Sequence, residues 1–408
     1  MSQEKLILAV NAGSSSVKIS VYVTHAQELK QVAEATLSGL TSPPAKLKLS
    51  IDGKSIAKDE EIEKIESQED AFGAILTRLE SEESLSQLKN KNDITHVVHR
   101  VVHGGDFQEP QKLTPETVEI LDHLTELAPL HNAPALAIVK KCNELLSHAH
   151  SYACFDTQFH ATIPKYVSTY PIDPEIAEKN KLRRYGFHGL SYSFMTRTIA
   201  TALKRNDVNL ILCHLGSGAS VCAVEQGKSI DTTMGLTPLE GLPGATRSGS
   251  LDPSLIFHYA SNVGKLSGTS TSALHISKAE EILNKQAGWK ALTGTTDFGV
   301  LTEKMTGSGK EAEACHLAFD LFVHRLTSII GGYFVQLEGK VDALVFAGGI
   351  GEKSDVLRRA VVDKIACLGF SLHAHSQDKI DRVQWLGDKV LLCETDEQRE
   401  MAQMIMND

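Results

Sequence analysis

Apolar runs of strand length recur along the chain, and two of them lead into the same kind of turn. Residues 6–10 are all apolar, a Gly/Ser-rich turn follows Asn11, and a run with alternating apolar positions comes next. Residues 210–224 repeat this order, with GSGAS between two apolar runs. Each copy predicts a β-hairpin. The repetition predicts two related domains.

The first turn carries groups that bind an anion. Residues 13–16 offer backbone N–H groups and three serine hydroxyls, and the ammonium of Lys18 follows. An ordinary hairpin with a serine-rich tip would look the same if it stood alone. Because the design occurs twice, we interpret the two turns as contacts for one polyphosphate.

Periodicity, helix caps and Gly/Pro-rich segments define most of the remaining elements. We predict helices over residues 71–88, 114–127, 135–146 and 311–337, loops over 127–134 and 231–253, and a strand, a Gly-rich turn and a helix over 341–361. The Gly-rich turn would place backbone amides at a helix N-terminus, where nucleotides bind. Such a turn also joins a strand to a helix without any ligand.

One arginine interrupts a β-branched run. Residues 94–105 predict a buried strand that contains Arg100 and the histidines His96, His99 and His103. Strand alternation puts His96 on the face opposite the other two, so the three predict no shared metal. A buried guanidinium is costly unless an anion lies beside it. A bound anion and a distant carboxylate are both open as partners.

Three further side chains stand where ligands commonly bind. Asp156 ends a short apolar run, and a carboxylate at the carboxyl end of a strand commonly faces the ligand crevice. His188 lies in a Gly-flanked loop, and Arg247 is the only cation of the 231–253 segment. A loop of that length and low charge is more typical of function than of disorder.

Composition bounds the class of protein. The 408 residues favour two domains, and 42% hydrophobic with 23% charged residues is typical of a globular protein. The net charge of −10 and the absence of a basic stripe argue against nucleic acid as a partner. Seven scattered cysteines, never spaced as CxxC, indicate reduced thiols. No signal peptide or membrane-length apolar run is visible, so we expect no membrane partner and a cytoplasmic protein.

The chain contains, in this order, the motifs NAGSSSVK, HRVVHGG, PLHNAP, FDTQFH, RYGFHGLS, HLGSGAS, DTTMGLTPLEGLPGATRSG, AGGIGEK and TDEQ. This ordered series resembles the motifs of acetate kinases and their propionate and butyrate relatives. The resemblance covers almost the whole chain. It implies the α/β fold of the acetate and sugar kinases, Hsp70 and actin, in which two duplicated domains enclose a cleft.

The resemblance also implies domain roles and a reaction. Residues 1–156 with 393–408 would form the N-terminal domain, and 157–392 a C-terminal domain that binds nucleotide and forms a homodimer. The family transfers a phosphoryl group reversibly from ATP to acetate, giving ADP and acetyl phosphate, with Mg²⁺ and with Mn²⁺ as an alternative metal. Acetate is already ionised near neutral pH, so no strong base is needed, and Asp156 takes the role of positioning metal and water. We favour direct in-line transfer over a covalent phospho-carboxylate route because it needs fewer steps.

Matching motifs assign the site residues. The catalytic group would consist of Arg100, Asp156, His188 and Arg247. The acyl group would contact Arg100, Val102, Leu130, Phe187 and Pro238. The nucleotide and its phosphates would contact Asn11, Ser14, Ser16, Lys18, His214, Gly216, Ser217, Gly218, Asp297, Phe298, Gly299, Gly348, Gly349, Ile350 and Gly351. The metal would be held by Asn11 and Glu397.

The chain departs from the family pattern at Tyr192, Ser217, Ser250, Gly299 and Lys353. We interpret these changes as drift on the nucleotide side. They leave open a propionate or other short-chain acyl kinase and a kinase that uses another phosphoryl donor such as pyrophosphate. A nucleotide-switched binding protein like actin or Hsp70 is the alternative from another class, although it would give Arg100 and Arg247 no anionic acceptor to hold.

Overall fold

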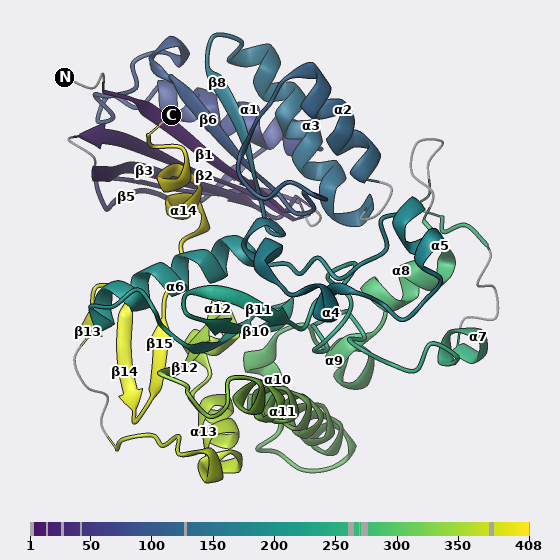
Figure 1. The fold of residues 1–408 in the computed structure, drawn as a ribbon. Coiled ribbons are helices and arrows are strands. Elements are labelled where there is room, and N and C mark those ends of the chain that lie inside the picture. The colour runs from purple at the N-terminus through teal and green to yellow at the C-terminus, as the bar shows by residue number, and fades with distance from the viewer. Residues whose placement is uncertain are drawn as a thin grey trace. The chain divides into compact units, whose positions relative to one another are not determined.

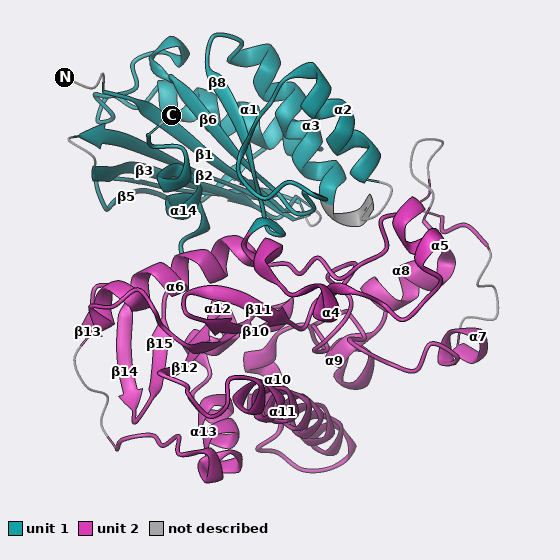
Figure 2. Cartoon of the chain, in the orientation of Figure 1, with its two compact units in different colours: residues 1–158, 396–408 teal, residues 159–395 magenta. Residues whose placement is uncertain are grey.

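The structure is a computed structural model that describes residues 4–13, 15–25, 28–40, 43–125, 129–259, 265–268, 270, 276–374 and 379–407, with residues 129–131 described by their backbone only. The chain forms two compact units, coloured separately in Figure 2. Unit 1 is Met1–Gln158 with Asp396–Asp408, and unit 2 is Phe159–Thr395. The domain boundaries predicted from the motifs lie close to these.

Within its described residues, unit 1 has an eight-stranded mixed sheet of order β5-β4-β3-β2-β1-β6-β8-β7 (Figure 1). Its strands are β1 (Leu6–Ala12), β2 (Ser16–His25), β3 (Glu28–Ser38), β4 (Ala45–Ile51), β5 (Lys54–Ile62), β6 (His96–Val101), β7 (Gln111–Lys112) and β8 (His150–Phe155). β1 pairs antiparallel with β2, which confirms the first hairpin. β1, β6 and β8 run parallel, so their carboxyl ends share one edge of the sheet.

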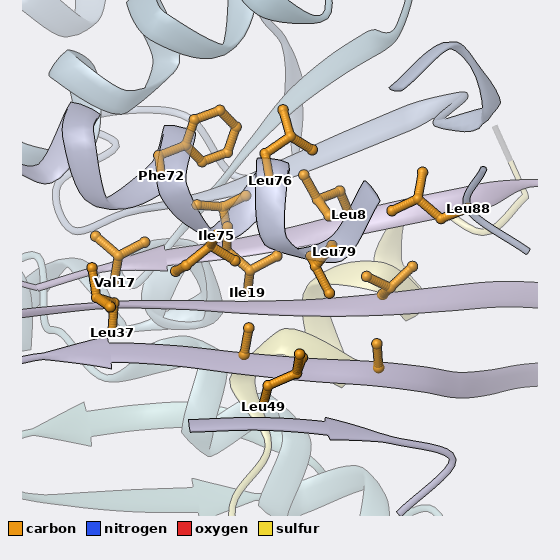
Figure 3. Close-up of a cluster of buried hydrophobic side chains, with 14 of the residues drawn as sticks. Leu8, Val17, Ile19, Leu37, Leu49, Phe72, Ile75, Leu76, Leu79 and Leu88 are labelled. Carbon is orange, nitrogen blue, oxygen red and sulfur yellow. The ribbon is translucent and has the colours of Figure 1, made fainter. Parts of the chain in front are cut away.

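Helices cover both faces of this sheet. They are α1 (Gln68–Glu80), α2 (Pro115–Leu124), α3 (Pro129–Leu145) and α14 (Glu397–Met404), with the 3-10 helix η1 (Lys91–Asp93). α1 begins at the cap residue Ser67, and its buried face of Phe72, Ile75, Leu76 and Leu79 packs on β-strand residues such as Leu8 and Ile19 (Figure 3). Figure 1 shows α14 on the sheet face opposite α1.

The loop predicted over residues 127–134 is wrong from Pro129 onward. α3 begins there and contains Pro134, although proline disfavours a helix interior. The Asn132 side chain accepts from the His103 N–H (2.8 Å) and donates to the His103 carbonyl (3.0 Å). These tertiary hydrogen bonds hold the first turns in place, and sequence propensity does not report them.

Among the residues described for unit 2, a seven-stranded mixed sheet has the order β11-β10-β9-β12-β15-β14-β13. Its strands are β9 (Leu210–Leu215), β10 (Ala219–Glu225), β11 (Lys228–Thr232), β12 (Ala343–Ala347), β13 (Lys379–Ile380), β14 (Val383–Gly387) and β15 (Val390–Cys393). β9 pairs antiparallel with β10 and parallel with β12, as β1 does with β2 and β6. The second hairpin is confirmed, and the pairing repeats that of unit 1.

Unit 2 has three layers. α6 (Gly189–Leu203) packs on one face of the sheet, and α11 (Lys310–Gln336) with α13 (Asp355–Lys364) packs on the other. α11 confirms the long helix predicted over 311–337. The remaining short helices are α4 (Lys165–Ser168), α5 (Pro174–Lys179), α7 (Leu255–Tyr259), α8 (Lys278–Lys285), α9 (Gly288–Thr293), α10 (Phe298–Lys304), α12 (Gly348–Lys353), η2 (Gln158–Thr162) and η3 (Ala366–Leu368).

The Gly-rich segment after β12 is a short helix rather than the predicted turn. α12 starts directly at Gly348 and stops at Lys353, and the side chain of Ser354 caps α13. The Arg358 guanidinium donates to the carbonyls of Gly351 (2.7 Å) and Glu352 (2.8 Å). Because the guanidinium satisfies carbonyls at the end of α12, this glycine-rich helix is stable in spite of its low propensity.

In the part of the chain that the structure describes, no helix combines the length and the apolar content that crossing a membrane requires.

Candidate active-site residues

Arg100 and Asp156 form the centre of a polar network in unit 1. Arg100 lies on β6 and Asp156 directly follows β8, so neighbouring parallel strands bring the two side chains to one edge. The Arg100 Nε donates to Asp156 Oδ1 (3.0 Å), and Nη2 donates to Oδ2 (2.6 Å). Of the two partners left open for this arginine, the distant carboxylate is present.

Asn11 and Glu397 complete this network. The Asn11 amide accepts from Arg100 Nη1 (3.2 Å) and donates to Glu397 Oε2 (2.8 Å). Glu397 Oε2 also lies 3.5 Å from Arg100 Nε. α14 therefore brings Glu397 to the end of β1, and the two residues predicted to hold the metal are in direct contact.

The ion pairs of this network determine the charge state of Arg100. Burial lowers the pKa of Arg100, but the negative charges of Asp156 and Glu397 outweigh burial and raise the pKa above its ordinary value. The guanidinium thus stays charged at any physiological pH. Only 1% of the Asp156 side chain is exposed, and both of its oxygens accept from Arg100. A carboxylate held in this way is a fixed charge rather than a freely available base.

Besides Asn11, the first hairpin carries three of the predicted phosphate contacts. Ser16 and Lys18 lie on β2, and Ser14 is outside the described residues. The N–H of Gly13 donates to the Ser16 carbonyl (2.8 Å), which closes the turn. The Lys18 ammonium pairs with Glu34 at 2.7 Å, and both side chains are exposed to solvent. An exposed pair of this kind is weak, so it leaves Lys18 available to an anion.

Besides Arg100, two residues of unit 1 are predicted to contact the acyl group. Val102 is buried immediately after β6, two residues from Arg100. Leu130 belongs to α3, and its side chain is outside the described residues.

A cavity of about 550 Å³ in unit 2 gathers much of the predicted nucleotide site. The turn of the second hairpin, the start of α10 and the helix α12 line it. Its predicted members are Gly216, Ser217, Asp297, Phe298, Gly299, Gly349 and Ile350, and Thr296, Thr302, Lys353 and Ser354 join them. The Asp297 carboxylate caps α10 by accepting from the N–H groups of Gly299 (2.7 Å) and Val300 (3.1 Å).

Other predicted nucleotide residues lie beside this cavity without lining it. Gly348 has a φ of +76°, and a Cβ there would come within 2.7 Å of the Leu215 carbonyl oxygen, so glycine allows α12 to approach β9. Gly351 is buried against Leu215 and Cys213 of the same strand. Ser250, expected on the nucleotide side, lines a separate cavity with Arg184 and Tyr333.

Arg247 lies against the second hairpin. Its Nη1 donates to the carbonyl of Pro238 (3.0 Å). Its Nη2 occupies the space that a side chain on Gly218 would fill, 1.9 Å from an ideal Cβ position. Gly218 therefore allows the guanidinium to reach the turn between β9 and β10, where the sequence predicted a phosphate.

His188 is the N-cap residue of α6 and has left-handed backbone dihedrals. Its Nδ1 lies 2.8 Å from the hydroxyl of Ser220 on β10, and its ring centroid lies 4.4 Å from that of His214. The preceding Phe187 is fully buried, and its carbonyl accepts from His160 Nε2 (3.0 Å). Tyr192, one turn along α6, lies in this layer and does not line the nucleotide cavity.

Sequence reasoning missed residues that hold the 231–253 segment. Arg184 donates to the carbonyls of residues 232, 233 and 234 and to Glu240 Oε1 (2.6 Å). Tyr170 donates to Glu240 Oε2 (2.5 Å). Glu240 is the only glutamate of a segment that is otherwise poor in charge, and this was the available signal that it pairs with a cation.

A divalent cation is compatible with the donors around Asn11. The carboxylate oxygens of Glu397 and the amide oxygen of Asn11 are the kinds of ligand that Mg²⁺ accepts, and Mg²⁺ is held in many phosphoryl-transfer sites by one or two carboxylates together with substrate phosphates. Among described residues, no group of three or more histidine, cysteine, aspartate or glutamate side chains could by itself hold a metal. Asn11 and Glu397, which are in direct contact, supply the amide and carboxylate oxygens that suit Mg²⁺.

Comparison with known proteins places the chain in a family. The model of the acetokinase family matches residues 6–405. A probable acetate kinase of Neurospora crassa is 49% identical, over 99% of this chain and 94% of that protein. A solved propionate kinase of Francisella tularensis superposes with a TM-score of 0.83 at 30% identity, covering 99% of both chains. The acetate kinase of Porphyromonas gingivalis gives a TM-score of 0.79 at 28% identity, over 98% and 99% of the two chains. With the two-domain α/β fold of these kinases and a match along nearly its full length, the chain belongs to the acetokinase family.

Proposed function

We propose that this protein transfers the γ-phosphoryl group of ATP reversibly to the carboxylate of acetate, giving acetyl phosphate and ADP. The observation that carries the proposal is the family match over residues 6–405, which includes every residue assigned to the reaction. Relatives of about half identity are named as probable acetate kinases.

The chemistry needs positive charge more than it needs a base. A carboxylate oxygen of acetate attacks the γ-phosphorus, the bond to the bridging oxygen breaks, and ADP leaves with the electron pair, so no proton is removed from the nucleophile. Charge accumulates on the equatorial oxygens of the phosphoryl group. Arg100, Arg247 and His188 are the groups that we assign to this charge. The capture of both Asp156 oxygens by Arg100 supports a positioning role for the carboxylate.

Mg²⁺ would be held by Asn11 and Glu397, with Mn²⁺ as a substitute, and when bound it would supply charge neutralisation on the donor phosphates. The donor itself is supported by the unit 2 cavity. Its 550 Å³ would be superfluous for pyrophosphate, whereas a nucleoside would use it. We therefore favour ATP in spite of Ser217, Gly299 and Lys353.

We also propose a homodimer that works in the cytoplasm. In α11, Phe319, Phe322, Leu326 and Ile330 are buried in the core of unit 2, whereas Leu317 is exposed. Light scattering after size exclusion is expected to give twice the 44.4 kDa of one chain, and a value of 44.4 kDa at micromolar concentration would contradict the dimer.

The test is hydroxamate detection of acetyl phosphate, with ATP, GTP and pyrophosphate as donors and acetate, propionate and butyrate as acceptors. We expect ATP and acetate to give the highest kcat/KM. Propionate is the second acceptor of interest because the Francisella neighbour is a propionate kinase. Arg247→Ala is the matched negative control. Nucleotide binding without acyl phosphate in either direction would refute the proposal and favour a nucleotide-switched binding protein.

A further inference from the structure

Three side chains in unit 2 form a hydrogen-bonded chain that ends on His188. The Ser220 Oγ lies 2.8 Å from His188 Nδ1 and 2.5 Å from the Tyr192 hydroxyl oxygen. Ser220 and Tyr192 are completely buried, and His188 is half-buried. The arrangement joins β10 to α6 directly behind the imidazole ring.

The direction of each hydrogen bond follows from the donors present. Burial raises the pKa of Tyr192 well above its ordinary value, so the phenol keeps its proton at neutral pH. A buried O–H needs an acceptor. Among the described side chains, Ser220 Oγ is the one at hydrogen-bonding distance from the phenol. Tyr192 therefore donates to Ser220, and the proton of Ser220 is directed at His188 Nδ1.

A nitrogen that accepts a hydrogen bond carries no proton. In the neutral imidazole the proton must then reside on Nε2. The neighbouring ring of His214, 4.4 Å away and tilted by 48°, restricts rotation of the His188 ring. The left-handed backbone at His188 further fixes where the side chain starts.

We propose that Ser220 and Tyr192 are positioning residues that hold His188 as the neutral Nε2–H tautomer, so that it presents an N–H donor to a phosphoryl oxygen. This inference rests on the proposed function for the role of His188. It assigns a reason to Tyr192, one of the positions at which the chain departs from the family pattern: the phenol fixes the direction in which the Ser220 hydroxyl donates.

A second serine–histidine pair in the same unit offers a matched control. The Ser229 hydroxyl lies 2.8 Å from His160 Nδ1, while His160 Nε2 donates to the Phe187 carbonyl. Ser229 and Ser220 are equally buried. Ser229→Ala thus removes the same kind of bond without touching His188 Nδ1.

The first experiment is NMR of the full chain with ¹⁵N-labelled histidine, and His188→Gln assigns the His188 signals. We expect couplings and shifts of an Nε2–H tautomer in the unmutated protein. Ser220→Ala should convert them to a tautomer mixture, and Ser229→Ala should leave them unchanged. An Nδ1–H tautomer or an imidazolium at neutral pH in the unmutated protein would overturn the proposal, as would unchanged signals in Ser220→Ala. This readout does not depend on catalysis, so it is separate from the failure of the proposed function.

Kinetics test the consequence. Ser220→Ala should lower kcat about 10- to 100-fold with little change in either KM, as for other partners that orient a functional histidine. Tyr192→Phe should lower kcat by a smaller factor than Ser220→Ala does. When Tyr192→Phe is added to Ser220→Ala, kcat should not fall further, because Tyr192 acts through Ser220. Ser220→Thr should restore part of kcat. Additive losses, or a normal kcat in Ser220→Ala, would refute the positioning role. If Ser220→Ala does not fold, the tautomer and kcat of Tyr192→Phe decide.

Discussion

Gly218→Ala isolates the contact between the second hairpin and Arg247. A Cβ at position 218 would lie 1.9 Å from Arg247 Nη2 and 2.9 Å from Cζ. Non-bonded heavy atoms need about 3.5 Å, so the guanidinium would have to retreat by about 1.5 Å. Gly218 does not have a positive φ, so alanine adds no backbone strain there. The obstacle is the flexible end of one side chain, which can move.

The expected result is therefore a loss of rate with little loss of stability. A displacement of 1 Å in a group that stabilises the transition state can lower the rate about 100-fold. We expect a fall of that order in kcat for Gly218→Ala. The hydrogen bond from Arg247 to the Pro238 carbonyl would be disturbed by the same movement. The thermal midpoint should change by no more than about 3 °C.

The assay is acyl hydroxamate formation with saturating ATP and acetate. Gly331→Ala is the control, because a Cβ at Gly331 in α11 would meet nothing within 4 Å. The double variant Gly218→Ala/Arg247→Ala should be no slower than Arg247→Ala alone if the effect passes through Arg247. A normal kcat in Gly218→Ala, or a further loss in the double variant, would contradict this explanation.

Three more predictions follow from buried or capping groups. Arg100→Ala should abolish most turnover. It should also lower the free energy of unfolding of unit 1, measured in urea, by about 3 kcal/mol, because it leaves the buried Asp156 carboxylate unpaired. An unchanged free energy of unfolding would contradict this. Burial lowers the pKa of His160 from 6.5 to about 4, so between these pH values only the unfolded chain binds the proton, and the free energy of unfolding should fall by about 3 kcal/mol as the pH drops through this window. His160→Gln should flatten the dependence of the urea midpoint on pH. Tryptophan fluorescence can follow this unfolding because both tryptophans lie in unit 2. Asp297→Ala should lose about 1 kcal/mol of helix capping and raise the KM for ATP, while Asp297→Asn keeps the cap; equal KM values in Asp297→Ala and the unmutated protein would exclude the link between the α10 cap and the nucleotide.

Sequence patterns predicted the elements whose formation depends on residues close together in the chain. The two hairpins, the apolar face of α1 and the long helix α11 follow from alternation, caps and helical spacing, and each is present. The ordered motifs led to the family, which the comparisons confirm.

The failures come from contacts between distant segments. The sequence around Pro134 does not indicate that Asn132 forms hydrogen bonds with His103. The sequence around Gly348 does not indicate that Arg358 donates to carbonyls at the end of α12. The partner of Arg100 was undecided for the same reason, since Asp156 stands 56 residues away in sequence. The roles of the site residues stay predictions, because geometry within each unit shows which groups meet and not what they do to a substrate.

The contact between Asn11 and Glu397 spans 386 positions of the chain. During synthesis, the ribosome must translate all of unit 2 before α14 can dock on the sheet of unit 1. A nascent or prematurely ended chain can thus build most of that sheet while the polar network around Arg100 lacks one of its two carboxylates. The order of translation therefore separates the folding of the first domain from the completion of its polar network.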